Sequence, residues 1–548
     1  MRKLLILMAA AVAMSCGKGN APAEIVVYGK IWTGNEKQPL AEAMAINADT
    51  IIAVGSRSDI SKYAGDKTEV IEAATDQLVV PGFIDTHTHF VDGGFRLQSV
   101  LLRDAKTPKE FIQRISDYGK TLPAGEWIVG GDWDHENWGG ELPDRNWIDS
   151  VTKDHPVWVT RLDGHMSLAN TAAIKAAGID DKVKDVPGGT IVRSKGRMTG
   201  VFKDNATTYI ERVIPAPGAV LEDRALDTAM AYVASKGVTS AHNMSGFMDA
   251  LDRAHKAGRL KTRIYAGMPL TEWRTLDARI KSQGAGDNWL RVGNLKAFVD
   301  GSLGSHTAAF HKGFVDAPKD SGFFVTPPEE LYKLIKSADS ARLNLMIHAI
   351  GDRAINSLLN IFERVDNENE DWPRRFRIEH AQHISPEDFP RFAQLGVIAS
   401  MQPYHAIDDG RWADKIIGPE RSKTTYAFKS LMDANAIVSF GSDWFVAPPT
   451  PLEGIYAAVT RRTLDDKNPD GWVPEQKVTV EQALKAYTTA GAYASFEEDI
   501  KGSLEPGKLA DFVILGSDIT VIDPVKIRDV KVVRTVVGGK TVFSDGPH

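Results

Sequence analysis

Cysteine is almost absent from this sequence, since its 548 residues include only Cys16. A single thiol cannot form a disulfide within one chain, so the fold must be stabilised without cross-links. Long blocks of one charge sign are also missing, and the formal net charge is −7. We therefore expect no nucleic-acid partner.

Repeats of about 20 residues and low-complexity tracts are absent as well. Hydrophobic residues make up 43% of the chain and charged residues 25%, which is ordinary for a soluble globular protein. The length exceeds that of one small domain. An α/β barrel with an insertion and a satellite domain would account for it.

The sequence has no apolar run long enough to cross a bilayer. Its longest one, residues 4–14, follows Arg2 and Lys3 and has the plan of a secretory signal. The segment ends at Cys16, in a setting that resembles a bacterial lipobox, although Ala13 stands where leucine is commoner. We therefore expect residues 1–16 to be a signal peptide of an exported protein, anchored to the membrane by a lipid on Cys16. Simple cleavage, which would leave a free periplasmic protein, is the alternative.

Both ends of the chain, residues 24–80 and 496–548, contain short β segments separated by turn residues. We expect them to pair into one small β-sandwich domain. The middle, residues 81–495, alternates helical stretches with eight apolar strand candidates: FIDTHTH, GVTSAHNM, TRIYAGM, LKAFVD, LNLMIHA, RFRIEHA, GVIASMQ and AIVSFGSD. This alternation predicts a (β/α)8 TIM-like barrel. Residues from about 127 to 230 break the rhythm and are expected to be a large insertion after the first strand, able to cover the barrel mouth.

Polar residues mark the ends of these strand candidates. His87 and His89 project to the same side because alternate strand residues share a face, yet an H-x-H pattern alone is weak evidence for a metal site. Lys296, His348, His380 and Asp443 occupy comparable positions at or near the ends of other strand candidates. Barrel active sites lie at the carboxyl ends of the strands, and buried polar groups need partners. We therefore expect these side chains to meet in one site.

These motifs together resemble the amidohydrolase superfamily, in particular the branch of N-substituted formamide deformylases known as amidohydrolase family 3. The resemblance covers essentially the whole mature chain and rests on VVPGFIDTHTHF, KAFVDGSLGSHTA, IHAIGDRA, RIEHAQ, MQPYH and FGSDWFVAPPTPLEGIYAAVTRR. It implies that His87, His89 and Asp443 bind the more buried of two divalent metals. It further implies that His348 and His380 bind the second, and that Lys296 bridges both as a carbamate.

The implied ligands suit this chemistry. An ammonium group cannot bind a cation, whereas a carboxylated Lys296 offers two oxygens to two neighbouring ions. Imidazole and carboxylate ligands favour Zn²⁺, with Mn²⁺, Fe²⁺ and Co²⁺ as alternatives, and a one-metal site also stays open. In the implied mechanism the metals lower the pKa of a water from about 15.7 toward 7, and the resulting hydroxide attacks a carbonyl. Asp443 takes the proton and returns it to the leaving nitrogen.

Several further residues are candidates for substrate contacts. His165 is expected to reach the site from the insertion and to hydrogen-bond the substrate carbonyl or stabilise the tetrahedral intermediate, with an ordinary turn histidine as the alternative. Tyr404 and His405 are expected to line the pocket. His306 stands where family members usually have arginine, so recognition of an acidic substrate group is in doubt. Trp133 is a candidate for an aromatic wall; the alternative is the core of the insertion.

The resulting expectation is a metal-dependent hydrolase that cleaves a non-peptide carbon–nitrogen bond in an N-substituted amide or formamide. A carboxylesterase or lactonase that uses the same metals is the first rival. The second is a catalytically silent binding protein, which should lack a ligand or the base, whereas this chain has the full set. The expected partner is a small-molecule amide, and a homo-oligomer stays open.

Overall fold

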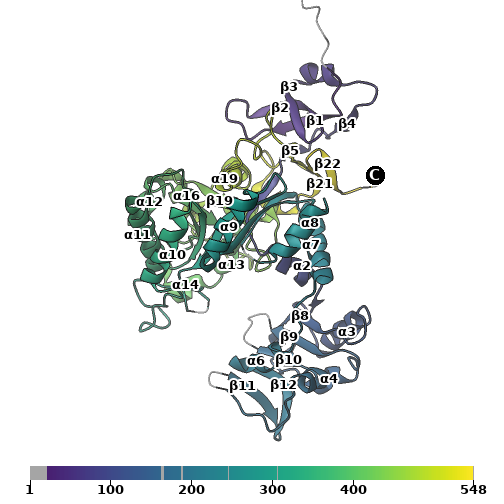
Figure 1. The fold of residues 1–548 in the computed structure, drawn as a ribbon, viewed down its shortest axis with the longest axis vertical. Coiled ribbons are helices and arrows are strands. Elements are labelled where there is room, and N and C mark those ends of the chain that lie inside the picture. The colour runs from purple at the N-terminus through teal and green to yellow at the C-terminus, as the bar shows by residue number, and fades with distance from the viewer. Residues whose placement is uncertain (1–20, 162–165, 187–188, 245, 305, 547–548) are drawn as a thin grey trace, which may run out of the picture.

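The computed structural model describes residues 21–161, 166–186, 189–244, 246–304 and 306–546. Three sheets organise these residues. Figure 1 shows a central barrel, a sheet formed by the two ends of the chain on one side, and a separate lobe on the other. None of the helices in the described ranges is long and apolar enough to cross a membrane. The expected signal segment with Cys16 lies outside these ranges.

The central sheet confirms the predicted barrel strands. Eight parallel strands follow one another in chain order: β6 (Phe83–Thr88), β13 (Val238–Asn243), β14 (Arg263–Pro269), β15 (Leu290–Phe298), β16 (Asn344–Ala349), β17 (Arg377–His380), β18 (Ile398–Met401) and β19 (Val438–Phe440). The first and last strands meet where Asp443 N donates to the His87 carbonyl at 2.8 Å and Thr88 bridges to Trp444. The barrel is therefore nearly closed, and its closure lies beside the predicted metal ligands.

Helices cover the outside of the barrel because their apolar residues recur with the helical period. In α11 (Asp352–Glu368), for example, Ile355, Leu358, Leu359 and Phe362 are buried. The other helices around the barrel are α2 (Phe90–Leu97), α7 (Ala219–Ala234), α8 (Met248–Lys256), α9 (Trp273–Gln283), α10 (Pro328–Ser340), α12 (Phe389–Gln394), α13 (Pro403–Asp409), α14 (Ala413–Ile417), α15 (Pro419–Ser422), α16 (Phe428–Asp433), α17 (Pro451–Thr460), α18 (Val480–Ala486) and α19 (Thr489–Ala494). With helices outside and side chains inside, strands such as β16 are buried on both faces, which explains their continuous apolar sequence.

Strands from both ends of the chain share the second sheet. Its order is β22-β21-β20-β5-β1-β2-β3, and β4 also pairs with β1. The bounds are β1 (Ile25–Trp32), β2 (Leu40–Asn47), β3 (Thr50–Gly55), β4 (Glu69–Glu72), β5 (Leu78–Pro81), β20 (Phe512–Leu515), β21 (Val532–Val537) and β22 (Lys540–Ser544), with the short α1 (Arg57–Ile60) beside them. The two ends join where β5 pairs antiparallel with β20. This is one eight-stranded sheet branched at β1, and its arrangement as a sandwich stays a prediction.

A buried ion pair connects this sheet to the barrel. Arg263 at the start of β14 donates through Nε and Nη2 to the two oxygens of Asp511, at 2.6 and 2.9 Å, and both side chains are buried. Asp511→Asn should lower the free energy of unfolding by about 3–5 kcal/mol, because the charge of Arg263 would stay buried without its counter-ion. Urea unfolding measures this effect. Glu72→Gln is the control: it breaks the exposed pair with Arg57 and should cost less than about 1 kcal/mol, so equal losses in the two variants would contradict the prediction.

The third sheet forms the insertion. Its order is β11-β12-β10-β9-β8-β7, with bounds β7 (Val100–Leu101), β8 (Ile128–Trp133), β9 (Val157–Arg161), β10 (Met166–Ala169), β11 (Gly189–Ser194) and β12 (Arg197–Asp204) and helices α3 (Pro108–Gly119), α4 (Arg145–Asp149), α5 (Thr171–Ala176) and α6 (Thr208–Glu211). The sheet starts before the expected residue 127, because β7 pairs with β8. The insertion also ends before the expected residue 230, because α7, which begins at Ala219, packs against α2 on the barrel. Figure 1 shows the insertion as a lobe beside the barrel.

Candidate metal centre

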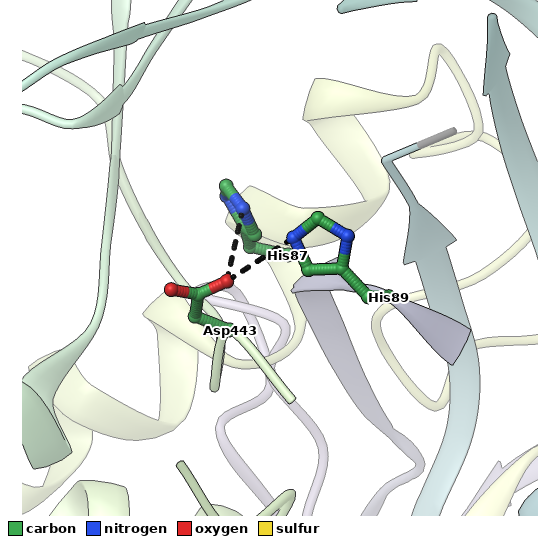
Figure 2. A group of neighbouring side chains, drawn as sticks. All are labelled: His87, His89 and Asp443. Carbon is green, nitrogen blue, oxygen red and sulfur yellow. Dashed lines mark ion pairs between the residues drawn. The ribbon is translucent and has the colours of Figure 1, made fainter. Parts of the chain in front are cut away.

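Three predicted ligands meet where the barrel closes. Nε2 of His87 and Nε2 of His89 each lie 3.4 Å from Oδ1 of Asp443 (Figure 2). A tetrahedral ion with bonds of about 2.0–2.1 Å separates its ligand atoms by about 3.3–3.4 Å. His87 is fully buried, whereas the side chain of His89 is 27% exposed. The three donors therefore fit one divalent ion that is reached from the pocket side.

The backbone around this group brings the three side chains together. A Cβ on Gly441 would lie 2.5 Å from the His87 nitrogen, so only glycine allows this approach of the last strand to the first. Asp443 has a φ of 61°, a left-handed backbone that turns its side chain at the strand end. Asp85 accepts hydrogen bonds from Ser442 N and Ser442 Oγ, at 2.9 and 2.6 Å. These contacts hold the Asp443 loop against β6.

The other three predicted ligands line the same pocket, which has a volume of about 410 Å³. Nζ of Lys296 lies 3.5 Å from Nε2 of His87. The rings of His348 and His380 are 4.5 Å apart, and those of His380 and His87 are 4.8 Å apart. Nε2 of His348 donates to the Gly301 carbonyl at 3.1 Å, which leaves its Nδ1 as the free ring nitrogen. All six side chains from the strand ends are thus gathered in one pocket.

Burial sets the charges of these groups. It lowers the pKa of His87 to about 4 and of His348 to about 3, so both imidazoles are neutral at pH 7, as metal binding requires. Burial also lowers the pKa of Lys296 to about 8, against the opposing effect of Glu379 and Asp443. For Asp443 burial alone would raise the pKa, but His87, His89 and His380 hold it well below its usual range. The site therefore combines neutral imidazoles with an ionised carboxylate.

His405 lines the pocket, as expected, from α13, and it also faces the carboxylate of Asp443. Its Nε2 lies 4.0 Å from Oδ2 of Asp443 and is buried without a hydrogen-bond partner among the described residues. The ring is parallel to that of His380 at 6.5 Å. One donor atom each from His380, His405 and Asp443 lie within 4.8 Å of one another. The two oxygens of Asp443 thus face different histidines.

A buried ion pair that the sequence motifs did not lead us to expect lies behind His87. Oε2 of Glu379 lies 2.5 Å from Nδ1 of His87, and its Oε1 lies 2.7 Å from Nε of Arg377. Burial alone would raise the pKa of Glu379, but Arg377 and His87 together lower it to about 2. The signal was present: Arg377 and Glu379 are two residues apart in the strand motif RFRIEHA, so both charges face the barrel interior and need partners there.

Some expected substrate contacts are not found in the pocket. Trp133 is fully buried in the core of the insertion and donates to the Val159 carbonyl at 2.8 Å, so it is no pocket wall. His306 turns to Asp316, with Nε2 3.0 Å from the carboxylate. Tyr404 packs against the barrel core and is not among the pocket residues. A small domain needs large aromatic residues for its own core, which explains why Trp133 is buried in the insertion and does not line the pocket. His165 lies outside the described residues, and its role stays a prediction.

None of the described residues of the insertion lines the pocket. Among the residues that the structure describes, the lining comes from the barrel strands and the loops and helices that follow them. Figure 1 shows the insertion as a lobe beside the barrel, and its ability to cover the barrel mouth stays a prediction.

Comparisons with known proteins agree with this architecture. A family model described as "Amidohydrolase family" matches residues 70–543. Protein LONG AFTER FAR-RED 3 of Arabidopsis thaliana is 38% identical over 535 residues, which cover 95% of this chain and 91% of that protein. An N-substituted formamide deformylase of Arthrobacter pascens is 27% identical over 540 residues, which cover 94% of this chain and 97% of that enzyme.

A solved structure shows the same fold. The crystal structure of an uncharacterized metal-dependent hydrolase from Pyrococcus horikoshii OT3 superposes with a TM-score of 0.77 at 28% identity, covering 91% of this chain and 99% of that one. The family model spans the barrel strands and much of the sheet formed by the two ends. The resemblance expected from the strand-end motifs is confirmed: this chain belongs to the amidohydrolase family.

Proposed function

We propose that this protein hydrolyses a non-peptide carbon–nitrogen bond in an N-substituted amide or formamide. Its family makes it a metal-dependent hydrolase of carbon–nitrogen bonds. The observation that carries the proposal is the convergence of the six strand-end side chains on one pocket, with two imidazoles 3.4 Å from one carboxylate oxygen. The similarity to an N-substituted formamide deformylase supports this class of substrate.

The donor set fits divalent metal ions without thiolate. His87, His89 and Asp443 would hold a first ion, and His348 and His380, which line the same pocket, would hold a second. Lys296, once its neutral amine has added CO2 to form a carbamate, would offer oxygen ligands to both ions. Nitrogen and oxygen donors favour Zn²⁺. When bound, such ions polarise the substrate carbonyl and supply a nucleophilic water near neutral pH.

The side chains of the pocket perform the remaining steps. Asp443 is ionised and faces the pocket, so it accepts the proton of the attacking water and then returns it to the leaving nitrogen. Nε2 of His405 has no hydrogen-bond partner among the described residues and is placed to hydrogen-bond the substrate. Phe298, Leu303 and Trp412 give one side of the pocket an apolar surface. This surface suits the apolar substituent of an amide.

Carboxylation of Lys296 gives a pH-dependent prediction. Only the neutral amine reacts with CO2, and with a pKa of about 8 the neutral fraction falls from about one half at pH 8 to about 1% at pH 6. At a fixed dissolved CO2 concentration, recovery of activity in metal-depleted protein should therefore be roughly tenfold or more faster at pH 8 than at pH 6. A ¹³C carbamate resonance from ¹³CO2, absent in Lys296→Met, identifies the adduct. Full recovery in CO2-free buffer would contradict the bridge.

The test of the proposed function is a set of matched substrates. Purified protein loaded with Zn²⁺ is assayed with N-substituted formamides, the corresponding amides, and esters and lactones of the same carbon skeletons. Turnover of the formamides or amides supports the proposal. Turnover of the esters alone would assign the chain to the carboxylesterases, and metal-loaded protein that binds these compounds without turnover would make it a binding protein.

A further inference from the structure

Two candidate ligands are held from behind by partners of different charge. Nδ1 of His87 faces the carboxylate of Glu379 at 2.5 Å, whereas Nδ1 of His380 faces the amide oxygen of Gln402 at 2.8 Å. All four side chains are buried. Since Nδ1 donates its proton in both contacts, Nε2 keeps its lone pair in both rings. The two rings thus have the same tautomer, but the group that accepts the Nδ1 proton is charged behind His87 and neutral behind His380.

Each partner is itself fixed in place. Arg377 holds Glu379 through its Nε, and its Nη atoms donate to Nδ1 of His242 at 2.8 Å, to Oγ of Ser400 at 3.0 Å and to the Thr86 carbonyl. The guanidinium of Arg377 therefore balances the charge of the carboxylate and faces the oxygen of Glu379 that does not contact His87.

Gln402 is fixed by a different contact. Its Nε2 donates to the Ser400 carbonyl at 3.3 Å, which leaves Oε1 facing His380. Unlike Glu379, it has no charge to place on the ring that it supports. Both hydrogen-bond partners are thus held by further contacts, and they differ in charge: Glu379 is ionised, whereas Gln402 is neutral.

We infer that Glu379, held by Arg377, is a positioning residue that makes the His87 side of the centre the tighter metal site, so that the two ions bind in order. A carboxylate that accepts the Nδ1 proton raises the basicity of the imidazole as a ligand, and such partners typically change metal affinity 10–100-fold. A neutral amide gives a weaker effect. The ion at His87, His89 and Asp443 is then retained, while the ion at His348 and His380 exchanges more readily. This inference rests on the two-ion centre of the proposed function.

The test is a Zn²⁺ titration of metal-depleted protein in competition with a chromophoric chelator, which reports two dissociation constants. In the wild-type protein one constant should be at least about tenfold smaller than the other. Glu379→Gln keeps the size and the acceptor oxygen but removes the charge, so the smaller constant should rise about 10–100-fold while the larger one changes little. Gln402→Met is the matched variant on the other ring and should raise only the larger constant.

Glu379→Gln also leaves Arg377 without its counter-ion, which destabilises the barrel. The double variant Arg377→Met, Glu379→Gln removes both charges and should show the same loss of the tight site; thermal unfolding identifies which variants are folded. If the smaller dissociation constant is unchanged in the folded variants, the inference is overturned. Two equal dissociation constants in the wild-type protein would overturn it as well. Wild-type protein that binds no Zn²⁺ would instead overturn the proposed metal centre itself.

Discussion

Asp443→Asn should lower kcat for amide hydrolysis by about 10²–10⁴-fold, the usual contribution of a group that transfers a proton in the transition state. Asparagine keeps a side-chain oxygen close to Nε2 of His87 and His89, where Oδ1 of the carboxylate lies now. It cannot accept a proton from water at neutral pH. The rate should therefore fall far more than the metal content, and both are measured on the same preparation.

Asp316→Asn is the control for this substitution. Asp316 is an exposed carboxylate that pairs with His306 and does not line the pocket. Its loss should leave kcat within about twofold of the wild-type value, since surface pairs contribute little. Wild-type turnover in Asp443→Asn would remove Asp443 from the role of proton acceptor.

Removal of the metal ions should reduce amide hydrolysis by roughly 10³-fold or more, since metal ions contribute several kcal/mol to the stabilisation of such transition states. Dialysis against a chelator, followed by the activity assay, measures the loss. Re-addition of Zn²⁺ should restore the activity, because the side chains that receive it are anchored by the barrel. The imidazoles of His87 and His348 are neutral at pH 7, as metal binding requires.

Thermal unfolding of the same samples separates loss of metal from loss of fold. Metal binding to the folded state alone adds stability that grows with the free ion concentration. The metal-depleted protein should therefore unfold at a lower temperature and recover on re-addition. Full activity in depleted and folded protein would contradict the role of the ions.

The barrel and its strand-end residues could be predicted because local pattern determines them. Strands buried on both faces show as apolar runs, and polar side chains at their carboxyl ends must share the barrel rim. His87, Lys296 and His348 follow this rule without any knowledge of the loops. A site built on parallel strands is therefore readable from one sequence.

Contacts made through loops and helices could not be predicted in this way. The orientation of α13 decides that His405 faces Asp443. Arg461 directly follows α17 and is buried, where it donates to the carbonyls of Trp472 and Tyr426. Trp133 is in the core of the insertion because of how that lobe folds. Sequence spacing carries no information on such tertiary packing.

The most direct test of the metal centre is anomalous diffraction from crystals of active protein, collected at the absorption edge of the metal that the purified protein contains. The account predicts one peak bounded by His87, His89 and Asp443 and a second beside His348 and His380. Active crystals without an anomalous peak between these side chains would contradict it.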